Sequence, residues 1–348
     1  MPNGDLACVW FGGTQEGLSD IDVYMSRLPA GGDRWQAPLR LSNDPLRSEQ
    51  NPLLFNAPDG RLILFHTAQQ SGKQDGAIIR MRVSQDGGGS FGPATVLPSE
   101  PGTFVRQPVI VNARGEWLLP VFFCRAPADG IWKGDYDTAG VLVSTDGGET
   151  WRPLDVPGST GAVHMNIVPL GGDRLVAVYR SRWADRIHLS RSFDGGASWS
   201  EPEPTELPNS NSSIQMILLH SGRLAIVYNH RSAQDAPERR RSLYDDIEGQ
   251  AASGHAVEEG RPERSAFWGA PRSPLTIALS DDEGRSWRRR ADLETGSGYC
   301  MTNNSKDRLN REFSYPSIVQ DAQGSIHIAF TYYRQAIKYL KIAEAALK

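Results

Sequence analysis

The sequence contains few cysteines and no long apolar segment. Its 348 residues include three cysteines, none of them in a Cys-x-x-Cys pair, so we expect reduced thiols rather than a disulfide framework. The longest apolar stretch, residues 117–124, is far too short to span a bilayer. The first residues lack the basic segment and the apolar run of a signal peptide. We therefore expect a cytoplasmic protein that is not inserted in a membrane.

No block of like charge dominates the chain, whose formal net charge is −4. Proteins that bind nucleic acid usually carry a basic patch or stripe, so nucleic acid is not an expected partner. The seven histidines form no His-Glu-x-x-His motif and no paired Cys/His spacing. A phosphate-binding loop and a dinucleotide fingerprint are also missing. The sequence therefore predicts neither a metal site nor a cofactor.

Glycine and proline are plentiful instead, at 35 and 23 residues, as in proteins built from short strands and tight turns. An eight-residue motif occurs four times. It begins with Ser, has Asp at its third position and Gly at its fifth, and ends in Trp or Phe. The copies are residues 84–91, 144–151, 192–199 and 280–287, and a degenerate fifth copy spans 26–35.

The chemistry of this motif is that of a turn between two strands. An Asp carboxylate can accept hydrogen bonds from backbone N–H groups just ahead of it, and Gly adopts positive φ without a steric clash. The closing Trp or Phe is large enough to pack between neighbouring sheets. The alternating ligands and distal Glu of an EF-hand calcium loop are missing. We therefore predict a structural role for Asp86, Asp146, Asp194 and Asp282.

Strands recur in the same order around each copy of the motif. An apolar strand at 61–66 follows a turn, and a further strand at 77–83 leads into the motif. Equivalent second strands are predicted at 6–10, 116–123, 174–179, 223–228 and 325–332, which makes six units. Each unit needs its neighbours to bury its apolar face. The sequence therefore predicts an all-β fold, a six-bladed β-propeller in which residues 1–348 form a single domain.

The first and the last units each lack a strand. The first unit begins directly with its second strand, and the last ends with a strand at 336–342 that no outer strand follows. We expect the first or the last sheet to be one strand short, or the ring to close in an unusual way. An N-terminus upstream of Met1 would account for both absences.

Strand order predicts which face carries the chemistry. The repeated turns lie on one face, so the starts of the first strands and the loops after the second strands lie on the other. Any single polar residue there could be a solvated loop residue, but the whole set favours a binding site for hydroxyls and carboxylates. The candidate substrate-binding residues are Glu49, Arg106, Gln107, Arg125, Asn166, Arg180, Arg182, Asn211 and Gln215. The candidate catalytic residues are Glu16, Asp20, His164, Glu312 and Tyr315.

The two longest loops open on the same predicted face. A polar insertion at 231–272 contains Trp268, and a second loop spans 294–311. Long loops in a compact domain are either disordered or functional. The aromatic residues in these loops favour lids over a ligand. Further residues singled out in the loops are Arg239, Arg240, Arg241, Tyr244, Asp246, Tyr299, Asn303, Asn304 and Lys306.

The motif copies and the six units resemble the Asp-box (bacterial neuraminidase repeat) proteins of the sialidase superfamily, over nearly the whole chain. The resemblance implies a carbohydrate-active enzyme. Its reaction would be that of an exo-glycosidase releasing a terminal acidic sugar, sialic acid or a related 2-keto acid, from an oligosaccharide. Family members are similar in using three arginines on the substrate carboxylate, a tyrosine nucleophile, a glutamate beside it and an acidic proton donor. The Arg-Ile-Pro signature of the family is absent here.

Two segments resemble the catalytic segments of that family. Residues 313–317, Phe-Ser-Tyr-Pro-Ser, are similar to the segment that opens with the nucleophile, which implies this role for Tyr315. Residues 12–22 resemble the loop that carries the acid/base, which implies Glu16 or Asp20. The arginines available on the same face are Arg106, Arg125, Arg180 and Arg182.

Elementary chemistry supports such a mechanism. The planar fork of arginine grips a carboxylate bidentately, and a neutral nucleophile avoids repulsion by that carboxylate. Tyrosine has an ordinary pKa of about 10, so it needs a nearby base to attack near neutrality. Either Glu312 or Glu49 could be that base.

Two other functions use the same polar face. In a lyase acting on uronate-containing glycans, arginines would neutralise the carboxylate and His164 or Tyr315 would abstract the adjacent proton. A lectin-like propeller would bind sugar without an acid/base pair. The acidic candidates Glu16, Asp20 and Glu312 favour an enzyme over a lectin.

Overall fold

The computed structural model describes residues 1, 3–128, 130–236, 240, 243, 264–300, 302 and 308–347. Over these residues the chain forms strands, with two short 3₁₀ helices, η1 (Ala233–Asp235) and η2 (Glu344–Ala346). A helix with the length and apolar character needed to cross a membrane does not occur in this part of the chain.

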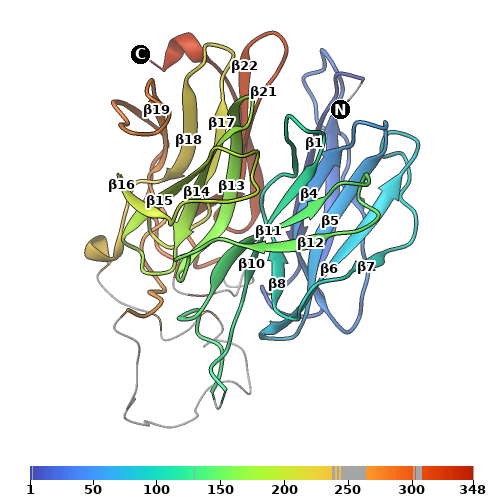
Figure 1. Cartoon of the computed structure of the whole chain (residues 1–348), viewed down its shortest axis with the longest axis horizontal. Coiled ribbons are helices and arrows are strands. Elements are labelled where there is room, and N and C mark those ends of the chain that lie inside the picture. The colour runs from blue at the N-terminus through green and yellow to red at the C-terminus, as the bar shows by residue number, and fades with distance from the viewer. Residues whose placement is uncertain are drawn as a thin grey trace.

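Six antiparallel sheets follow one another along the chain and form a six-bladed β-propeller (Figure 1). The first sheet contains β1 (Leu6–Gly12), β2 (Asp22–Leu28) and β3 (Leu39–Arg40). The second contains β4 (Ser48–Asn56), β5 (Leu62–Gln70), β6 (Lys73–Ser84) and β7 (Thr95–Leu97). The third contains β8 (Thr103–Val105), β9 (Ile110–Val111), β10 (Trp117–Phe123), β11 (Thr138–Ser144) and β12 (Arg152–Asp155), and both β8 and β9 pair with β10.

The fourth sheet contains β13 (Ala162–Gly171), β14 (Arg174–Ser181), β15 (Arg186–Ser192) and β16 (Glu203–Pro208). The fifth contains β17 (Gln215–Leu218), β18 (Leu224–Asn229), β19 (Leu275–Ser280) and β20 (Arg289–Glu294). The sixth contains β21 (Phe313–Gln320), β22 (Ser325–Tyr332) and β23 (Ala336–Ala343). The predicted second strands correspond to β1, β5, β10, β14, β18 and β22, so the prediction of a six-bladed propeller is confirmed.

The repeated motif forms equivalent turns between the third and fourth strands of the second to fifth sheets. In the first copy, the Ser84 hydroxyl donates to Asp86 Oδ1 at 2.7 Å, and the backbone N–H of Ser90 donates to the same oxygen at 2.9 Å. The backbone N–H of Gly88 donates to Ser84 Oγ at 2.6 Å. The other three copies repeat these bonds through Asp146, Asp194 and Asp282. The carboxylates are therefore structural, as predicted.

Apolar clusters fill the junctions from the first sheet round to the sixth. The aromatic residue that closes each motif packs towards the preceding sheet; Trp151 lies edge-on to Phe65, with ring centroids 6.1 Å apart. Trp199 and Trp287 occupy the next two junctions in the same way. Among the described residues, no such cluster joins the sixth sheet to the first.

The first and the sixth sheets each have three strands, as expected from the sequence. In the first sheet β1 pairs only with β2 among the described strands. All seven residues of β1 are half-buried, whereas every residue of its counterparts β10 and β18 is buried. The apolar strand β1 therefore lies uncovered beside the central channel.

The motif carboxylates make stability depend on pH. The Thr150 hydroxyl, the Thr150 N–H and the Ser144 hydroxyl lower the pKa of Asp146 to about 2. Because the folded pKa lies below the unfolded value of about 3.9, this contribution is complete above that value and is lost as the pH falls towards 2. We expect Asp146→Asn to lower the melting temperature at about pH 6 and to melt close to wild type at about pH 2.

Thermal unfolding followed by circular dichroism tests this expectation. Asp155→Asn, at an exposed position of the adjoining strand β12, is the matched control and should melt like wild type at both pH values. An equal loss of melting temperature for Asp146→Asn at both pH values would contradict the assigned role of the carboxylate.

Candidate active site

Four residues in or just before the innermost strands of their sheets share an unusual backbone conformation. Asn51, His164, Asn211 and Tyr315 have φ values of 51°, 55°, 52° and 52°. The pairing register shifts at the same point in β4, β13 and β21, so these strands carry bulges. A bulge changes the direction in which a side chain points. Left-handed backbone outside glycine costs on the order of 1 kcal/mol or more and is concentrated at functional sites.

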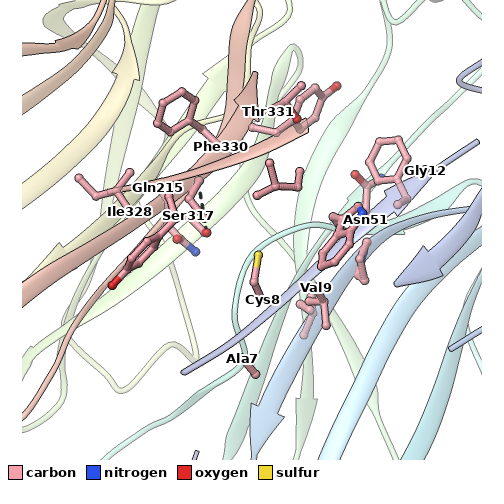
Figure 2. Close-up of a pocket in the computed structure, with 18 of the residues that line it drawn as sticks. Ala7, Cys8, Val9, Gly12, Asn51, Gln215, Ser317, Ile328, Phe330 and Thr331 are labelled. Atoms are coloured by element: carbon pink, nitrogen blue, oxygen red, sulfur yellow. Dashed lines mark hydrogen bonds between the residues drawn. The ribbon is translucent and has the colours of Figure 1, made fainter. Parts of the chain in front are cut away.

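A cavity of about 460 Å³ lies at the centre of the propeller. Its polar lining comes from several sheets and includes Glu16, Asn51, Arg106, Gln215, Glu312, Tyr315 and Arg334, together with Ser317, His327, Thr331 and Gln335. A small adjoining pocket shares Glu16, Asn51 and Tyr315 with it and adds Gln50, His164, Arg180 and Arg182. Figure 2 shows Gln215 and Ser317 on one wall of the cavity and Asn51 on the other.

Tyr315 lies half-buried among cationic side chains. The guanidinium carbon of Arg106 lies 5.6 Å from the centre of its ring, and that of Arg272 lies 5.7 Å away. Phe11 of β1 contacts the ring edge-on, with centroids 6.4 Å apart. These contacts hold the ring in place, and Tyr315 lines the cavity.

Two of the arginines are held by a buried carboxylate. Arg272 donates to Glu312 Oε2 at 3.0 Å, and Arg334 donates through Nε to the other oxygen of Glu312. Arg334 also donates through Nη1 to Glu16 Oε2 at 2.9 Å. Burial would raise the pKa of Glu312, but the charges of Arg334 and Arg272 outweigh it and lower the pKa to about 2. Glu312 is therefore an ionised anchor for two guanidinium groups.

Two other arginines have only neutral acceptors. Arg180 donates through Nε to Asn211 Oδ1 at 2.7 Å, and Arg106 donates to the backbone oxygen of Pro316 at 3.4 Å. Burial lowers the pKa of Arg106 to about 10 and that of Arg180 to about 9, and in both cases the nearby Tyr315 offsets part of the effect. Within the part of the chain that the structure describes, neither arginine has a carboxylate within ion-pair distance. The site therefore holds excess positive charge beside Tyr315.

His164 supports one of these arginines. Its Nε2 lies 3.4 Å from Arg180 Nη1, and its Nδ1 lies 3.1 Å from Ser213 Oγ. Burial, followed by the charges of Arg180 and other arginines, holds the pKa of His164 well below its ordinary value. A neutral ring that donates to Ser213 and accepts from Arg180 satisfies this geometry. The same charges disfavour an imidazolium, so His164 is poorly placed to accept a proton from substrate.

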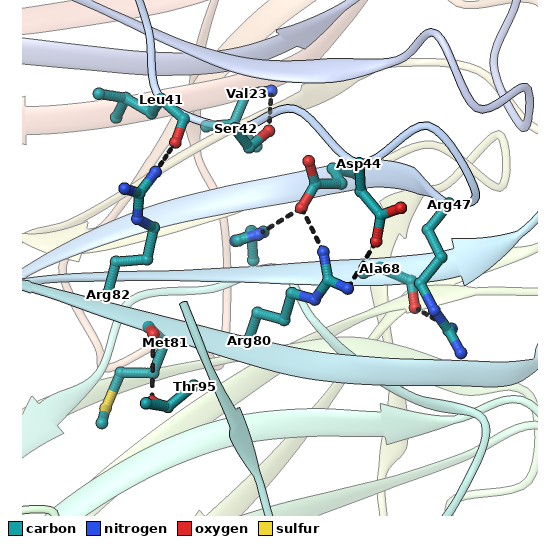
Figure 3. Close-up of polar contacts among 12 residues, drawn as sticks. Val23, Leu41, Ser42, Asp44, Arg47, Ala68, Arg80, Met81, Arg82 and Thr95 are labelled. Carbon is teal, nitrogen blue, oxygen red and sulfur yellow. Dashed lines mark hydrogen bonds and ion pairs between the residues drawn. The ribbon is translucent and has the colours of Figure 1, made fainter. Parts of the chain in front are cut away.

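The structure does not bring Glu49, Asp20 or Arg125 to the cavity lining. Glu49 accepts from Arg80 at 2.8 Å and lies 3.0 Å from His66 within the second sheet, and Figure 3 shows the same Arg80 bound to Asp44. The register shift in β4 turns Asn51 inward instead. Exposed Asp20 accepts the backbone N–H of Thr14 at 3.0 Å. Arg125 is also exposed and pairs with Glu100 at 2.8 Å.

The amide candidates join neighbouring inner strands. Gln107 donates to the backbone oxygen of Ile214 at 2.6 Å, and Gln215 donates to Gln107 Oε1 at 3.3 Å. Asn166 accepts the backbone N–H of Met216 at 2.5 Å. The Gln107 bonds join the third sheet to the fifth across the channel, and the Asn166 bond joins the fourth sheet to the fifth. Of the amides, Gln215 also lines the cavity.

Arg182 holds part of the insertion against the channel mouth. It donates to Asp137 Oδ2 at 2.8 Å, and its guanidinium carbon lies 5.6 Å from the Trp132 ring and 5.1 Å from the Trp268 ring. Asp137 thus neutralises Arg182, and Trp268 covers it. Arg239, Arg241, Tyr244, Asp246, Asn303, Asn304 and Lys306 lie outside the described residues.

Sequence reasoning missed Arg272, whereas Arg334 lies in one of the polar segments expected on the active face after the second strands. Arg272 ends the polar insertion, and its position directly before the third strand of its unit, on the active face, is the signal that could have found it. Arg334 follows β22 at the corresponding position of the last unit. Among the described residues, no three His, Cys, Asp or Glu side chains gather as a metal-binding group.

Antiparallel sheets, Asp-box turns and an arginine-lined centre define a six-bladed propeller of the Asp-box class. The chain belongs to the BNR repeat-like domain family, whose sequence profile matches residues 4–328. No match to a curated protein was found.

Solved structures with the same fold include sialidases and trans-sialidases. The Hadza microbial sialidase Hz136 superposes with a TM-score of 0.71 at 14% identity, covering 99% of this chain and 64% of its own. The NanB sialidase from Streptococcus pneumoniae gives 0.69 at 12% identity, with 99% and 67% covered. The intramolecular trans-sialidase from Ruminococcus gnavus gives 0.68 at 14% identity, with 100% and 94% covered. The chain thus spans less than two thirds of the Hadza enzyme, and these likenesses show the sialidase-like propeller fold.

Proposed function

We propose that this protein is an exo-glycosidase of sialidase type that releases a terminal acidic sugar, sialic acid or a related 2-keto acid. The observation that supports this most is the pair Arg106 and Arg180, which face Tyr315 without a carboxylate partner among the described residues. A buried cation without a counter-ion is costly, and a bound anion relieves that cost. A sugar carboxylate suits the two planar guanidinium groups.

The remaining roles follow from the contacts. Tyr315 is the nucleophile that attacks the anomeric carbon, because it carries a neutral hydroxyl and its ring contacts Arg106 of the anion site. Its phenolic proton passes to solvent in the cavity that it lines. Glu16 is the proton-transferring group, since it lines the cavity with Tyr315 and forms a single ion pair, to Arg334, among the described residues. Glu312 orients Arg272 and Arg334 rather than activating Tyr315, because the two guanidinium groups lower its pKa to about 2 and so make it too weak a base to take the phenolic proton.

A uronate lyase would use the same arginines. It would need His164 or Tyr315 as the base, and the arginines around His164 disfavour its protonated form. The Ruminococcus gnavus trans-sialidase structure is a complex with oseltamivir carboxylate, a ligand that carries the acidic group expected here.

The reaction class is tested by incubating the protein with sialosides and, separately, with uronate-containing oligosaccharides. Release of free sugar acid from the sialoside is expected. Formation of an unsaturated uronate, seen by its ultraviolet absorbance, with intact sialosides would establish the lyase instead. Binding of either sugar without formation of any product would indicate a lectin.

Arg180→Lys tests the anion site. Lysine keeps the charge but loses the fork that the Asn211 and His164 contacts orient. We expect the dissociation constant for the free sugar acid to rise about tenfold to 100-fold. Titration calorimetry measures it, with Arg125→Lys as the matched control because Arg125 is exposed and paired with Glu100. If the two variants bound the free sugar acid with equal affinity, Arg180 would not be part of the anion site.

A further inference from the structure

Two buried arginines that lie two residues apart donate to acceptors of different charge. Arg180 donates through Nε to the neutral amide oxygen of Asn211 at 2.7 Å. Arg182 donates through Nε to the carboxylate of Asp137 at 2.8 Å. Both acceptors are buried as well. The carboxylate cancels the charge of Arg182, whereas the amide leaves the charge of Arg180 available to a bound anion.

Asn211 acts on the site through Arg180 and does not contact the space that a ligand would fill. It lines neither the central cavity nor the small adjoining pocket, whereas Arg180 lines that pocket. The amide nitrogen of Asn211 donates to the backbone oxygen of Phe267 at 2.8 Å. Because a guanidinium can only donate and a carbonyl oxygen can only accept, these two contacts fix which end of the amide faces Arg180. Asn211 is thus a positioning residue that supplies an oriented and uncharged acceptor.

The backbone holds residue 211 in place by separate contacts. Asn211 has a φ of 52°, and its N–H donates to Asn209 Oδ1 at 3.0 Å. The same oxygen accepts the N–H of Ser181, the residue between the two arginines, at 3.0 Å. Asparagine and aspartate are both enriched at positive φ. The backbone conformation therefore suits either residue, and it is the neutral side chain that leaves Arg180 without a counter-ion here.

We infer that Asn211 sets the specificity of the site for an acidic sugar over a neutral one, because it orients Arg180 without neutralising it. This inference rests on the proposed function. An aspartate at position 211 would pair with Arg180, as Asp137 pairs with Arg182, and would repel a carboxylate bound beside it. The carboxylate of the sugar would then bind little better than an uncharged group of similar shape.

The test compares the dissociation constants of sialic acid and of its C1 carboxamide, a neutral analogue, by titration calorimetry. We expect the wild-type protein to bind the acid about 100-fold more tightly than the carboxamide. In Asn211→Asp this ratio should fall below about tenfold, because the acid binds more weakly while carboxamide affinity changes by less than about threefold. Asn43→Asp is the matched control: Asn43 is an exposed amide that accepts from Arg40 at 2.8 Å and does not line the cavity, so the ratio should not change.

Asn211→Gly separates the charge at this position from the orientation of Arg180. Glycine keeps the positive φ without strain and removes the acceptor, so both ligands should bind about tenfold more weakly. Arg180 keeps its charge, so the ratio should stay within about threefold of the wild-type value. A ratio below about tenfold in Asn211→Gly would overturn the inference, even if Asn211→Asp failed to fold.

Melting curves followed by circular dichroism show whether each variant is folded. A wild-type ratio in folded Asn211→Asp would overturn the inference and leave the proposed function standing. A wild-type protein that bound sialic acid no more tightly than the carboxamide would instead overturn the proposed function, and the inference with it.

Discussion

Tyr315→Phe should lower kcat by about 1,000-fold or more and change the dissociation constant of the free sugar acid by less than about threefold. The substitution removes only the hydroxyl. The ring keeps its contacts with Arg106, Arg272 and Phe11, so the anion site is preserved. The arginines bind the sugar acid in the ground state, whereas the Tyr315 hydroxyl acts in the transition state. Loss of the hydroxyl therefore slows the chemical step and leaves ground-state binding unchanged.

Steady-state kinetics on a sialoside and calorimetry with the free sugar acid measure the two quantities. Tyr136→Phe is the matched control, because Tyr136 is 39% exposed and lines neither pocket, so both quantities should stay unchanged. If Tyr315→Phe retained more than about a tenth of wild-type kcat, Tyr315 would not be the nucleophile.

Glu312→Gln should destabilise the protein by about 3–5 kcal/mol, because it leaves Arg272 and Arg334 buried without their shared carboxylate. The side chain of Glu312 is fully buried, so solvent does little to compensate. Urea unfolding measures the free energy, with Glu203→Gln on the exposed part of β16 as control. A loss below about 1 kcal/mol would show that the ion pairs contribute little to folding.

The same variant has a signature in pH. The pKa of Glu312 is lowered to about 2 in the folded protein, below the unfolded value, so its contribution is present near neutrality and is lost as the pH falls through that range. The stability difference between wild type and Glu312→Gln should therefore shrink as the pH is lowered from about 5 towards 2. A difference that grew on acidification would contradict this assignment.

The fold could be predicted because the residues that form each Asp-box turn lie within one short segment of the chain. The bonds between Ser84, Asp86 and Ser90 join residues within one octapeptide, and the sequence shows all of them in order. Each copy fixes the third and fourth strands of its sheet, and the apolar second strands follow from alternation and turn residues. Counting these local units was enough to predict six sheets.

The site could be predicted only in part, because its geometry depends on bulges and on distant partners. Nothing in the string Ser48-Glu49-Gln50-Asn51 shows that the register shifts there, and the shift sends Asn51 to the cavity and Glu49 into its own sheet. Arg180 and Arg182 stand two residues apart in the chain. Asp137, in a loop of the third sheet, accepts a hydrogen bond from Arg182 but not from Arg180. Such choices arise from contacts between sheets, which spacing along the chain does not encode.

The uncovered junction beside β1 also bears on how the propeller opens. Among the described residues, apolar clusters connect the sheets in series from the first to the sixth, so these two sheets are the terminal repeats of the series, and ring contacts such as Trp35–Tyr339 and Phe11–Tyr315 join them. Tyr315 belongs to one terminal repeat and Glu16 to the other, and the Arg334–Glu16 ion pair connects them. Terminal repeats fray most readily. A ligand that touches both would hold the array closed, so substrate occupancy and resistance to local unfolding would rise together.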